Sequence, residues 1–275
     1  MAELPELEIL RREADKDLSN RKIKTIDITV AGAIKKAGPK KQLLERVEGM
    51  KITGVSRVGE SLVLKLDSGD ALLVVLGNTG RMVRAQTKDA VPKGLVATLP
   101  FTQHGGLRII DPAKHSQLLV VAQDDVAATA ALGGFDLADE PVSWTAFGER
   151  LLRRTEKIKT IMMDSAFLVG IGPIYSDEVL FECGLRADRT PQTLTPQEIR
   201  RLYRAIVEIV HEAMKHGGTT VGPDGWTNLS GGTGGYGQFL AVHGREGLMT
   251  PRARGPVVKA KFGSGVTYYC EATQM

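Results

Sequence analysis

The sequence predicts an α+β protein in which a β-rich segment comes first, a helical segment follows, and a small β-hairpin ends the chain. Three patterns support this prediction. Short β-type runs recur between residues 20 and 125, helical periodicity dominates to about residue 216, and β-type runs return after residue 237. The close spacing of the first runs is typical of a β-sandwich or a β-barrel. We therefore divide the chain into domains at 1–130, 131–236 and 237–275.

An amphipathic helix is expected first, over residues 4–18. Leu7, Leu10, Ala14 and Leu18 recur at helical spacing beneath a charged face. Because this helix begins almost at the first residue, we expect the fold to hold the N-terminus in place.

The β-rich segment contains a clear hairpin signal. Runs at 61–67 and 71–76 flank the sequence Asp67-Ser68-Gly69-Asp70, whose residue types favour a tight turn. Further strands are expected at 81–85, 95–99, 107–110 and 117–122.

The helical segment, which follows Gly133-Gly134, contains one helix with both of its ends marked. Thr195 supplies an N-cap oxygen, and Glu198 completes a capping box. Gly217-Gly218 ends the helix. The glycine-rich stretch 217–237 is poor in apolar residues, which predicts a mobile loop outside the core. The last strands are expected at 239–243, 257–262 and 266–270.

Composition excludes several classes of protein. With 42% hydrophobic residues in 275, the chain is not disordered as a whole. The two cysteines, Cys183 and Cys270, are too few for a four-cysteine zinc site or a disulfide-stapled scaffold. No apolar run approaches the roughly 18 residues of a membrane span. A net charge of +4 permits a nucleic acid or another anionic partner and requires neither. We expect a reduced intracellular protein with no cofactor, no metal and no membrane association.

The N-terminus carries possible chemistry. Methionine before a small residue is commonly removed, which would expose the α-amine of Ala2. Such an amine has a pKa of about 7.7–8.0, so much of it is neutral and nucleophilic near neutral pH. Glu3 beside it could transfer protons. A plain helix start with acidic residues in its first turn explains the same pattern.

A second candidate is the turn Gly170-Ile171-Gly172-Pro173 between two apolar helical stretches. Backbone N–H groups at the start of the following helix would face solvent near Lys159, which is a suitable place for a phosphate group. A packing element without a ligand explains this pattern equally well.

Five motifs taken together are more specific than any one of them. They are Glu3–Glu8; Asp67–Gly69 followed by Val75–Gly80; Gly170–Glu178; Gly217–Thr220; and His243–Gly247. In content and order they resemble the bacterial formamidopyrimidine-DNA glycosylase and endonuclease VIII family of base-excision repair enzymes, over essentially the whole chain. The resemblance implies an N-terminal β-sandwich flanked by helices, a helix–two-turn–helix domain and a C-terminal β-hairpin finger. It also implies double-stranded DNA, with a damaged base or an abasic site, in the cleft between the domains.

The resemblance assigns catalysis to the N-terminus, where the chain departs from the family. The family's nucleophile is an N-terminal proline, and Ala2 stands in its place, while the following glutamate persists as Glu3. A primary amine can still form an imine with C1′ of a damaged nucleoside or an abasic sugar. We therefore expect a slower or altered reaction.

Several phosphate contacts of the family are also replaced. Its lysine in the strand after the first turn corresponds to Glu60, its two-turn asparagine to Pro173, and its finger arginine to a position near Gly265. Each change removes a contact to the DNA backbone. Lys159 and the turn at Gly172 remain as expected phosphate contacts. The expected basic residues of the finger are Arg245, Arg252, Arg254, Lys259 and Lys261.

The resemblance also places residues that fill the space left by an everted base, and residues that read that base. Asn78, Lys114 and His115 take the void-filling positions and are more polar than the family's Met, Arg and Phe. The base-recognition loop is expected at residues 221–226, with Thr220, Val221 and Trp226 as candidates. Cys270 is left from the family's four zinc-binding cysteines, so we expect a zincless finger.

Two functions compete, and a third is kept open. The first is a DNA glycosylase and abasic-site lyase that acts through Ala2 with Glu3 as its acid and base. The second is a non-catalytic relative that binds damaged DNA. The third is a protein that binds structured RNA through the same basic surface. In each case we expect a monomer in the bacterial cytoplasm, associated with the nucleoid.

Overall fold

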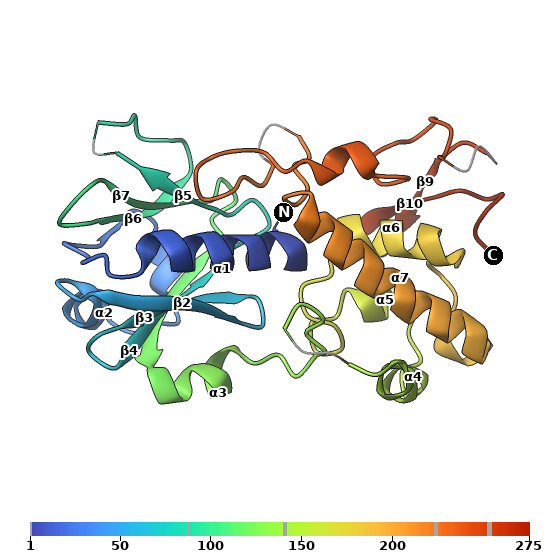
Figure 1. Cartoon of the computed structure of the whole chain (residues 1–275), viewed down its shortest axis with the longest axis horizontal. Coiled ribbons are helices and arrows are strands. Elements are labelled where there is room, and N and C mark those ends of the chain that lie inside the picture. Colours follow the sequence, from blue (N-terminus) through green and yellow to red (C-terminus); the bar gives the residue numbers. More distant parts are fainter. Residues whose placement is uncertain (1, 87, 140–141, 223–224, 252–254) are drawn as a thin grey trace. The chain divides into compact units, whose positions relative to one another are not determined.

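The computed structural model describes the chain except residues 1, 87, 140–141, 223–224 and 252–254. The chain forms two compact units (Figure 1). Unit 1 contains Met1–Ala131 and His216–Gly235, and unit 2 contains Leu132–Lys215 and Tyr236–Met275. The stretch 216–235 thus packs with the N-terminal unit, and the C-terminal hairpin packs with the helices. The three-part division at residues 130 and 236 stays a prediction.

Unit 1 is a β-sandwich flanked by helices, as expected. One antiparallel sheet has the order β2-β3-β4-β8 and the other the order β1-β6-β7-β5. The strands are β1 (Asp27–Ile28), β2 (Ile52–Val58), β3 (Ser61–Leu66), β4 (Asp70–Val75), β5 (Arg81–Ala85), β6 (Leu95–Pro100), β7 (Gly106–Ile110) and β8 (Gln117–Ala122). The predicted hairpin is confirmed, because Lys65 pairs with Ala71 across the turn.

The core of unit 1 lies between the two sheets and beneath α1 (Leu4–Leu18). Leu10, Ala14 and Leu18 of α1 are fully buried against apolar residues of both sheets, as the helical periodicity predicts. The outer face of β3 and β4 is covered by Val126 and Ala130 of α3 (Val126–Ala130). The sheet that contains β3 is therefore buried on both faces, which explains the nearly continuous apolar run of that strand.

Four helical elements of unit 1 were not predicted. They are α2 (Lys40–Val47), α3 and the 3-10 helices Ala31–Ile34 and Gln123–Asp125. Leu43 and Val47 anchor α2 in the main core.

Unit 2 is helical and carries the hairpin. Its helices are α4 (Trp144–Leu152), α5 (Ile158–Met162), α6 (Pro173–Cys183) and α7 (Pro196–Lys215), with the 3-10 helices Pro191–Thr193 and Tyr236–Phe239. The capping box of α7 is confirmed, because the Glu198 N–H donates to Thr195 Oγ1 at 3.2 Å and the Thr195 N–H donates to Glu198 Oε2 at 2.8 Å. Among the described residues, no helix is long and apolar enough to cross a membrane.

The hairpin consists of β9 (Val258–Phe262) and β10 (Gly265–Tyr269), paired antiparallel. The strand expected at 239–243 is wrong. The N–H groups of Ala241, Val242 and His243 donate to the Glu178 carboxylate at 2.7–3.0 Å instead of to a neighbouring strand. A buried carboxylate thus satisfies the donors that a sheet would otherwise take.

Candidate functional site

The first candidate site lies at the start of α1. Glu3 is the N-cap residue and forms a capping box with Glu6, because the Glu3 N–H donates to Glu6 Oε2 at 2.9 Å and the Glu3 side chain accepts from the Glu6 N–H. Both side chains are buried, with exposed fractions of 2% and 0%. Ala2 is half-buried and packs against the main core. The residue after Ala2 is therefore a buried carboxylate whose backbone is fixed by the helix cap.

Glu6 also fixes the stretch 216–235 to α1. Its Oε1 accepts the Thr219 N–H at 2.7 Å. Gly218 has a φ of +78°, and a Cβ there would lie 3.0 Å from Glu6 Oε1 and 3.1 Å from the Trp226 ring. The left-handed backbone and the close packing both require glycine.

The expected base-recognition residues have different environments. Thr220 closes the base of the loop, because its Oγ1 donates to the Trp226 carbonyl at 2.7 Å and accepts the Gly234 N–H at 2.8 Å. Val221 is 44% exposed, whereas Trp226 is 1% exposed and belongs to the main core with Leu229. The expectation that this glycine-rich stretch lies outside the core is therefore wrong. Positions 223–224 of the expected loop lie outside the described residues.

Unit 1 brings the three expected void-filling residues onto two adjoining loops. Asn78 lies on one loop, and Lys114 and His115 lie on the other; all three are exposed. The loops are joined because the Gly77 N–H donates to Ser116 Oγ at 3.0 Å, and Thr79 Oγ1 donates to the buried Asp111 carboxylate. No pattern in the sequence indicated that Asp111 joins these two loops.

The turn between β2 and β3, which carries Glu60, is fixed to α1 by Arg57. The Arg57 guanidinium donates to the Gly59 carbonyl at 2.7 Å and pairs with Glu8 at 3.4 Å. Burial alone would raise the pKa of Glu8, but hydrogen bonds from Arg11 and Arg12 and the charge of Arg57 lower it. Glu8 is therefore an ionised structural anchor on α1.

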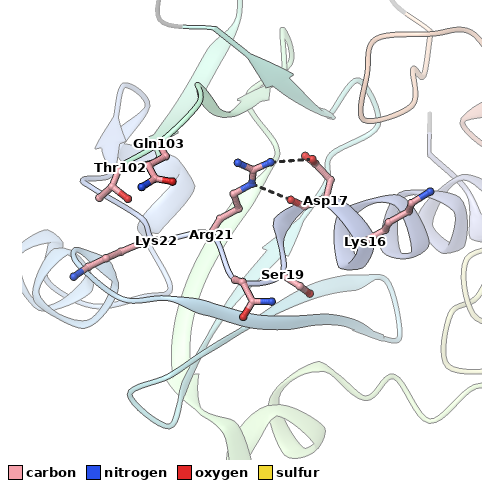
Figure 2. Close-up of a pocket in the computed structure, with 8 residues that line it drawn as sticks. Lys16, Asp17, Ser19, Arg21, Lys22, Thr102 and Gln103 are labelled. Carbon is pink, nitrogen blue, oxygen red and sulfur yellow. Dashed lines mark hydrogen bonds and ion pairs between the residues drawn. The ribbon is translucent and has the colours of Figure 1, made fainter.

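A polar pocket of about 470 Å³ lies at the other end of α1 (Figure 2). It is lined by Lys16, Asp17, Ser19, Asn20, Arg21, Lys22, Thr102 and Gln103. The Arg21 guanidinium is already engaged, because it donates to the Asp17 carbonyl at 3.1 Å and to its carboxylate at 3.5 Å. Lys16 and Lys22 point in different directions, so the cations do not converge on one point.

In unit 2, the two-turn motif runs from α5 to α6. Gly170 has a φ of +66°, and Gly172 is the N-cap of α6 with Pro173 in the first turn. Proline fits the first turn of a helix because no N–H is needed there for the helix. It also provides neither an N–H nor an amide side chain for a phosphate.

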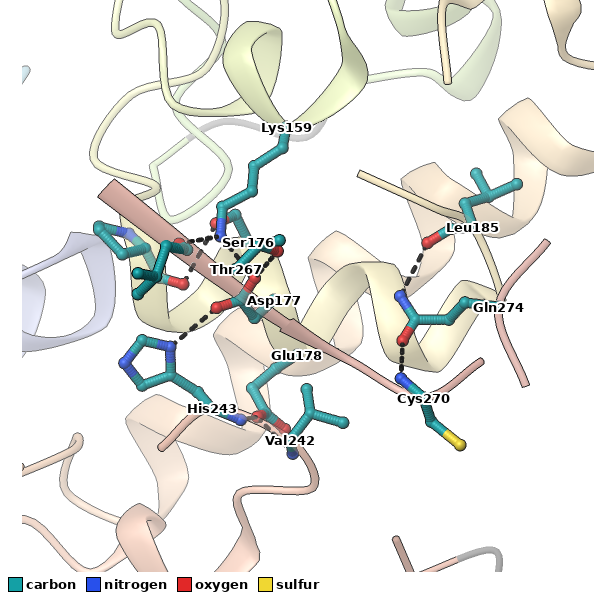
Figure 3. Close-up of polar contacts among 12 residues, drawn as sticks. Lys159, Ser176, Asp177, Glu178, Leu185, Val242, His243, Thr267, Cys270 and Gln274 are labelled. Carbon is teal, nitrogen blue, oxygen red and sulfur yellow. Dashed lines mark hydrogen bonds and ion pairs between the residues drawn. The ribbon is translucent and has the colours of Figure 1, made fainter. Parts of the chain in front are cut away.

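Lys159, which was expected to contact phosphate, is buried. Its side chain is 1% exposed, and Nζ lies 2.5 Å from Oδ1 of the fully buried Asp177 (Figure 3). Oδ1 of Asp177 also accepts the Thr267 hydroxyl at 2.6 Å, and Oδ2 lies 2.9 Å from His243 Nδ1. This network joins α5, α6, β10 and the loop at residue 243. The phosphate contact expected for Lys159 stays a proposal, and in this structure the ammonium of Lys159 is paired with the Asp177 carboxylate.

Hydrogen bonds near the end of the chain hold the end of the hairpin to the segment that follows α6. The Gln274 side chain accepts the Cys270 N–H at 2.9 Å and donates to the Leu185 carbonyl at 2.8 Å (Figure 3). The Arg186 guanidinium lies 4.0 Å from the Tyr269 ring centroid. Among the described residues, no group of three or more His, Cys, Asp or Glu side chains could hold a metal ion. A lone buried Cys270 beside Thr273 and Gln274 does not fit the donor set of structural zinc.

The expected basic residues of the finger have different exposures. Lys259 and Lys261 of β9 are exposed, and Arg245 is half-buried. Lys259 lies 3.8 Å from Glu246, whereas Lys261 has no ion-pair partner among the residues that the structure describes. Arg252 and Arg254 lie outside the described residues.

The sequence matches the models of two domains from a class of DNA repair proteins. The formamidopyrimidine-DNA glycosylase N-terminal domain matches residues 1–118, and the formamidopyrimidine-DNA glycosylase H2TH domain, where H2TH denotes helix–two-turn–helix, matches residues 134–224. The chain belongs to the formamidopyrimidine-DNA glycosylase and endonuclease VIII family.

Individual relatives match over their full length. A formamidopyrimidine-DNA glycosylase of Pelotomaculum thermopropionicum is 31% identical over 100% of this chain and 99% of its own. One of Desulfitobacterium hafniense is 29% identical over 100% of both chains. Among solved structures, Lactococcus lactis Fpg in complex with DNA containing an abasic site superposes with a TM-score of 0.91, at 27% identity and 99% coverage of each chain.

Proposed function

We propose that this protein is a base-excision DNA glycosylase and abasic-site lyase that uses the α-amine of Ala2 as its nucleophile. The observation that carries the proposal is the buried Glu3 at the N-cap of α1, next to Ala2 and fixed by Glu6. The names of the relatives support it, as does the solved complex of Lactococcus lactis Fpg with abasic-site DNA. The partner is double-stranded DNA with a damaged base or an abasic site.

The chemistry needs a neutral amine and a carboxyl group beside it. At a damaged nucleoside, the amine of Ala2 attacks C1′, and the bond to the base breaks as the new N–C1′ bond forms. The departing base keeps the bonding electrons and takes up the proton that the amine loses. Glu3 supplies the proton needed for opening of the sugar ring, and an imine results. At an abasic site, the amine adds to the C1′ aldehyde, and loss of water gives the same imine.

DNA binding is assigned to unit 2 and to the two loops of unit 1. Lys259 and Lys261 provide exposed positive charge for phosphates, and Arg245, Arg252 and Arg254 are proposed to add to it. The turn at Gly172 and Pro173 positions the backbone. A phosphate contact by Lys159 is also proposed, and it requires the ammonium to leave Asp177, with which it is paired.

The loops with Asn78, Lys114 and His115 are proposed to fill the space of the everted base. Thr220 and Val221 border the pocket for that base, and Trp226 supports it from the core. The relatives reported are bacterial, and we propose a monomer in the cytoplasm that acts on the bacterial chromosome.

Borohydride trapping tests the nucleophile. Protein and duplex DNA with an abasic site are mixed, borohydride reduces any imine to a stable amine, and the adduct is mapped by mass spectrometry. We expect an adduct at Ala2 in the wild type and in Ala2→Pro, which restores the family's nucleophile. Glu3→Gln should form the adduct about 100-fold more slowly, the usual size of a general acid–base contribution.

The Ala2→Pro variant makes a negative result informative. If Ala2→Pro is trapped and the wild type is not, although its Met1 has been removed, the site is built for catalysis but Ala2 does not perform it. The proposed lyase activity is then wrong.

A second candidate function is non-catalytic binding of damaged DNA. One observation favours it: Ala2 stands at the position where the family has its nucleophilic proline. It predicts tight binding to a duplex with a stable abasic-site analogue and no adduct in any wild-type sample.

A further inference from the structure

Asp111 is an unusual carboxylate in unit 1. Its side chain is fully buried, yet it has no ion-pair partner among the residues that the structure describes. It accepts hydrogen bonds from neutral groups only. The donors to its carboxylate are the Thr79 hydroxyl, the Ser116 hydroxyl, and the N–H groups of Ala113, His115 and Ser116, the last four at 2.7–3.1 Å.

These donors belong to the two loops that carry the exposed side chains of Asn78, Lys114 and His115. Thr79 follows Asn78, and its Oγ1 also accepts the Ala113 N–H at 3.1 Å from the other loop. The two loops are therefore joined on both sides of the carboxylate.

Two glycines permit this close approach. A Cβ at Gly77 would lie 2.5 Å from Asp111 Oδ2 and 2.8 Å from the His115 Cβ. A Cβ at Gly80 would lie 2.8 Å from Ser116 Oγ. Only glycine at these positions lets one loop lie directly on the other.

The backbone at Lys114 carries strain. Its φ is +61°, in the left-handed region that residues with a Cβ seldom adopt. The Lys114 N–H donates to the Asp111 carbonyl at 3.0 Å, and the following N–H donates to the Asp111 carboxylate at 2.8 Å. Asp111 thus holds the conformation that exposes Lys114 and His115 side by side.

We propose that Asp111 is a positioning residue that makes the two loops one rigid unit and presents Asn78, Lys114 and His115 together to an opened DNA duplex. This inference rests on the proposed function for its ligand. The coupling of the two loops through Asp111 does not depend on the proposed function. Because the loops are already ordered, they lose little conformational entropy when they insert into an opened duplex. The rigid unit therefore favours binding to opened DNA over binding to intact DNA.

Hydrogen exchange of the protein without DNA tests the coupling. Thr79→Val removes one hydroxyl from the first loop, and Thr79→Ser keeps it. We expect Thr79→Val to speed amide exchange at residues 111–117 of the other loop about tenfold, the change that corresponds to one lost buried hydrogen bond. Thr79→Ser should exchange like the wild type. If Thr79→Val alters exchange only in its own loop, the inference is wrong, whatever the fate of the proposed function.

Binding tests the positioning role. Affinity is measured for a duplex with a stable abasic-site analogue and for the same duplex intact. Thr79→Val and Asp111→Asn should lower the preference for the abasic duplex about tenfold and leave binding to intact DNA unchanged. A merely structural role would lower both affinities by the same factor, which would overturn the proposal. Equal wild-type affinity for both duplexes, with coupled exchange, would contradict the proposed function alone.

Discussion

Two fully buried aspartates organise the two units in different ways. Asp111 in unit 1 is surrounded by neutral donors, four of them within five residues of it in the sequence. Asp177 in unit 2 pairs with the cation of Lys159 and contacts His243 and Thr267, which are 66 and 90 residues away. Neutral hydrogen-bond donors, most of them close in the sequence, stabilise the buried charge of Asp111. Asp177, which joins distant elements, is instead stabilised by the opposite charge of Lys159.

The largest effect is expected when the cation of Lys159 is removed. Lys159→Met leaves Asp177 buried without its countercharge, and we expect a loss of about 3–5 kcal/mol in the free energy of unfolding. Urea denaturation measures it. The double variant Lys159→Met, Asp177→Asn should recover part of that loss, because it removes the uncompensated charge as well. Equal losses of unfolding free energy in the single and double variants would contradict a stabilising ion pair between Lys159 and Asp177.

Substitution of Asp111 should cost less stability than substitution of Lys159, and the cost should depend on pH. Burial alone would raise the pKa of Asp111, but the hydrogen bonds from Thr79, Ser116 and His115 lower it overall. A lowered folded-state pKa contributes stability above the unfolded value of about 3.9 and loses it as pH falls through the folded value. Asp111→Asn should therefore cost about 1–3 kcal/mol at pH 7.

The matched measurement is thermal unfolding of both proteins between pH 7 and pH 3. The difference between wild type and Asp111→Asn should shrink as pH falls below about 4. A stability difference that stays constant across this pH range would show that the charge of the Asp111 carboxylate does not contribute to the stability of the protein.

The hairpin gives a smaller test in unit 2. Gln274→Ala removes the two hydrogen bonds to Cys270 and Leu185, and we expect a loss of about 1–3 kcal/mol. Gln274→Glu is the matched variant, because it keeps the acceptor and loses the donor to the Leu185 carbonyl. A chelator should leave the unfolding temperature of the wild type unchanged, and a drop on adding it would point to a bound metal.

The smallest effect concerns the exposed cations. Lys261→Gln should weaken DNA binding and lower the slope of log affinity against log salt by about 0.9, the value for one phosphate contact. Lys41→Gln on α2, where Lys41 is exposed and lies 3.9 Å from Glu45, is the control and should leave the slope unchanged. An unchanged slope in Lys261→Gln would remove that residue from the DNA interface.

The elements that the sequence predicted well are those whose signals are local. The apolar spacing of α1, the turn between β3 and β4 and the capping box of α7 each lie within a few residues, and all three are confirmed. The segment 239–243 was assigned wrongly because its N–H groups bind Glu178, 63–65 residues away. No local pattern contains that information.

The candidate sites follow the same rule. Glu3 could be found from the sequence because it follows the candidate nucleophile Ala2, and the structure adds its capping box with Glu6. The burial of Lys159 against Asp177 and of Trp226 in the core depends on tertiary packing. The sequence instead suggested a phosphate contact for Lys159 and a mobile loop for the stretch that contains Trp226. Asp111 and His243 act through partners that only the fold brings together.

The side-chain clamp of Gln274 has a consequence for the conditions under which the hairpin keeps its shape. Zinc held by thiolates is lost when the sulfurs are oxidised or the metal is withdrawn. Here the Gln274 amide joins the end of the hairpin to Leu185, and the buried Cys270 sulfur accepts the Thr273 hydroxyl at 3.5 Å. The two contacts of Gln274 are formed by amide and backbone groups, which neither a chelator nor the oxidation of thiols removes.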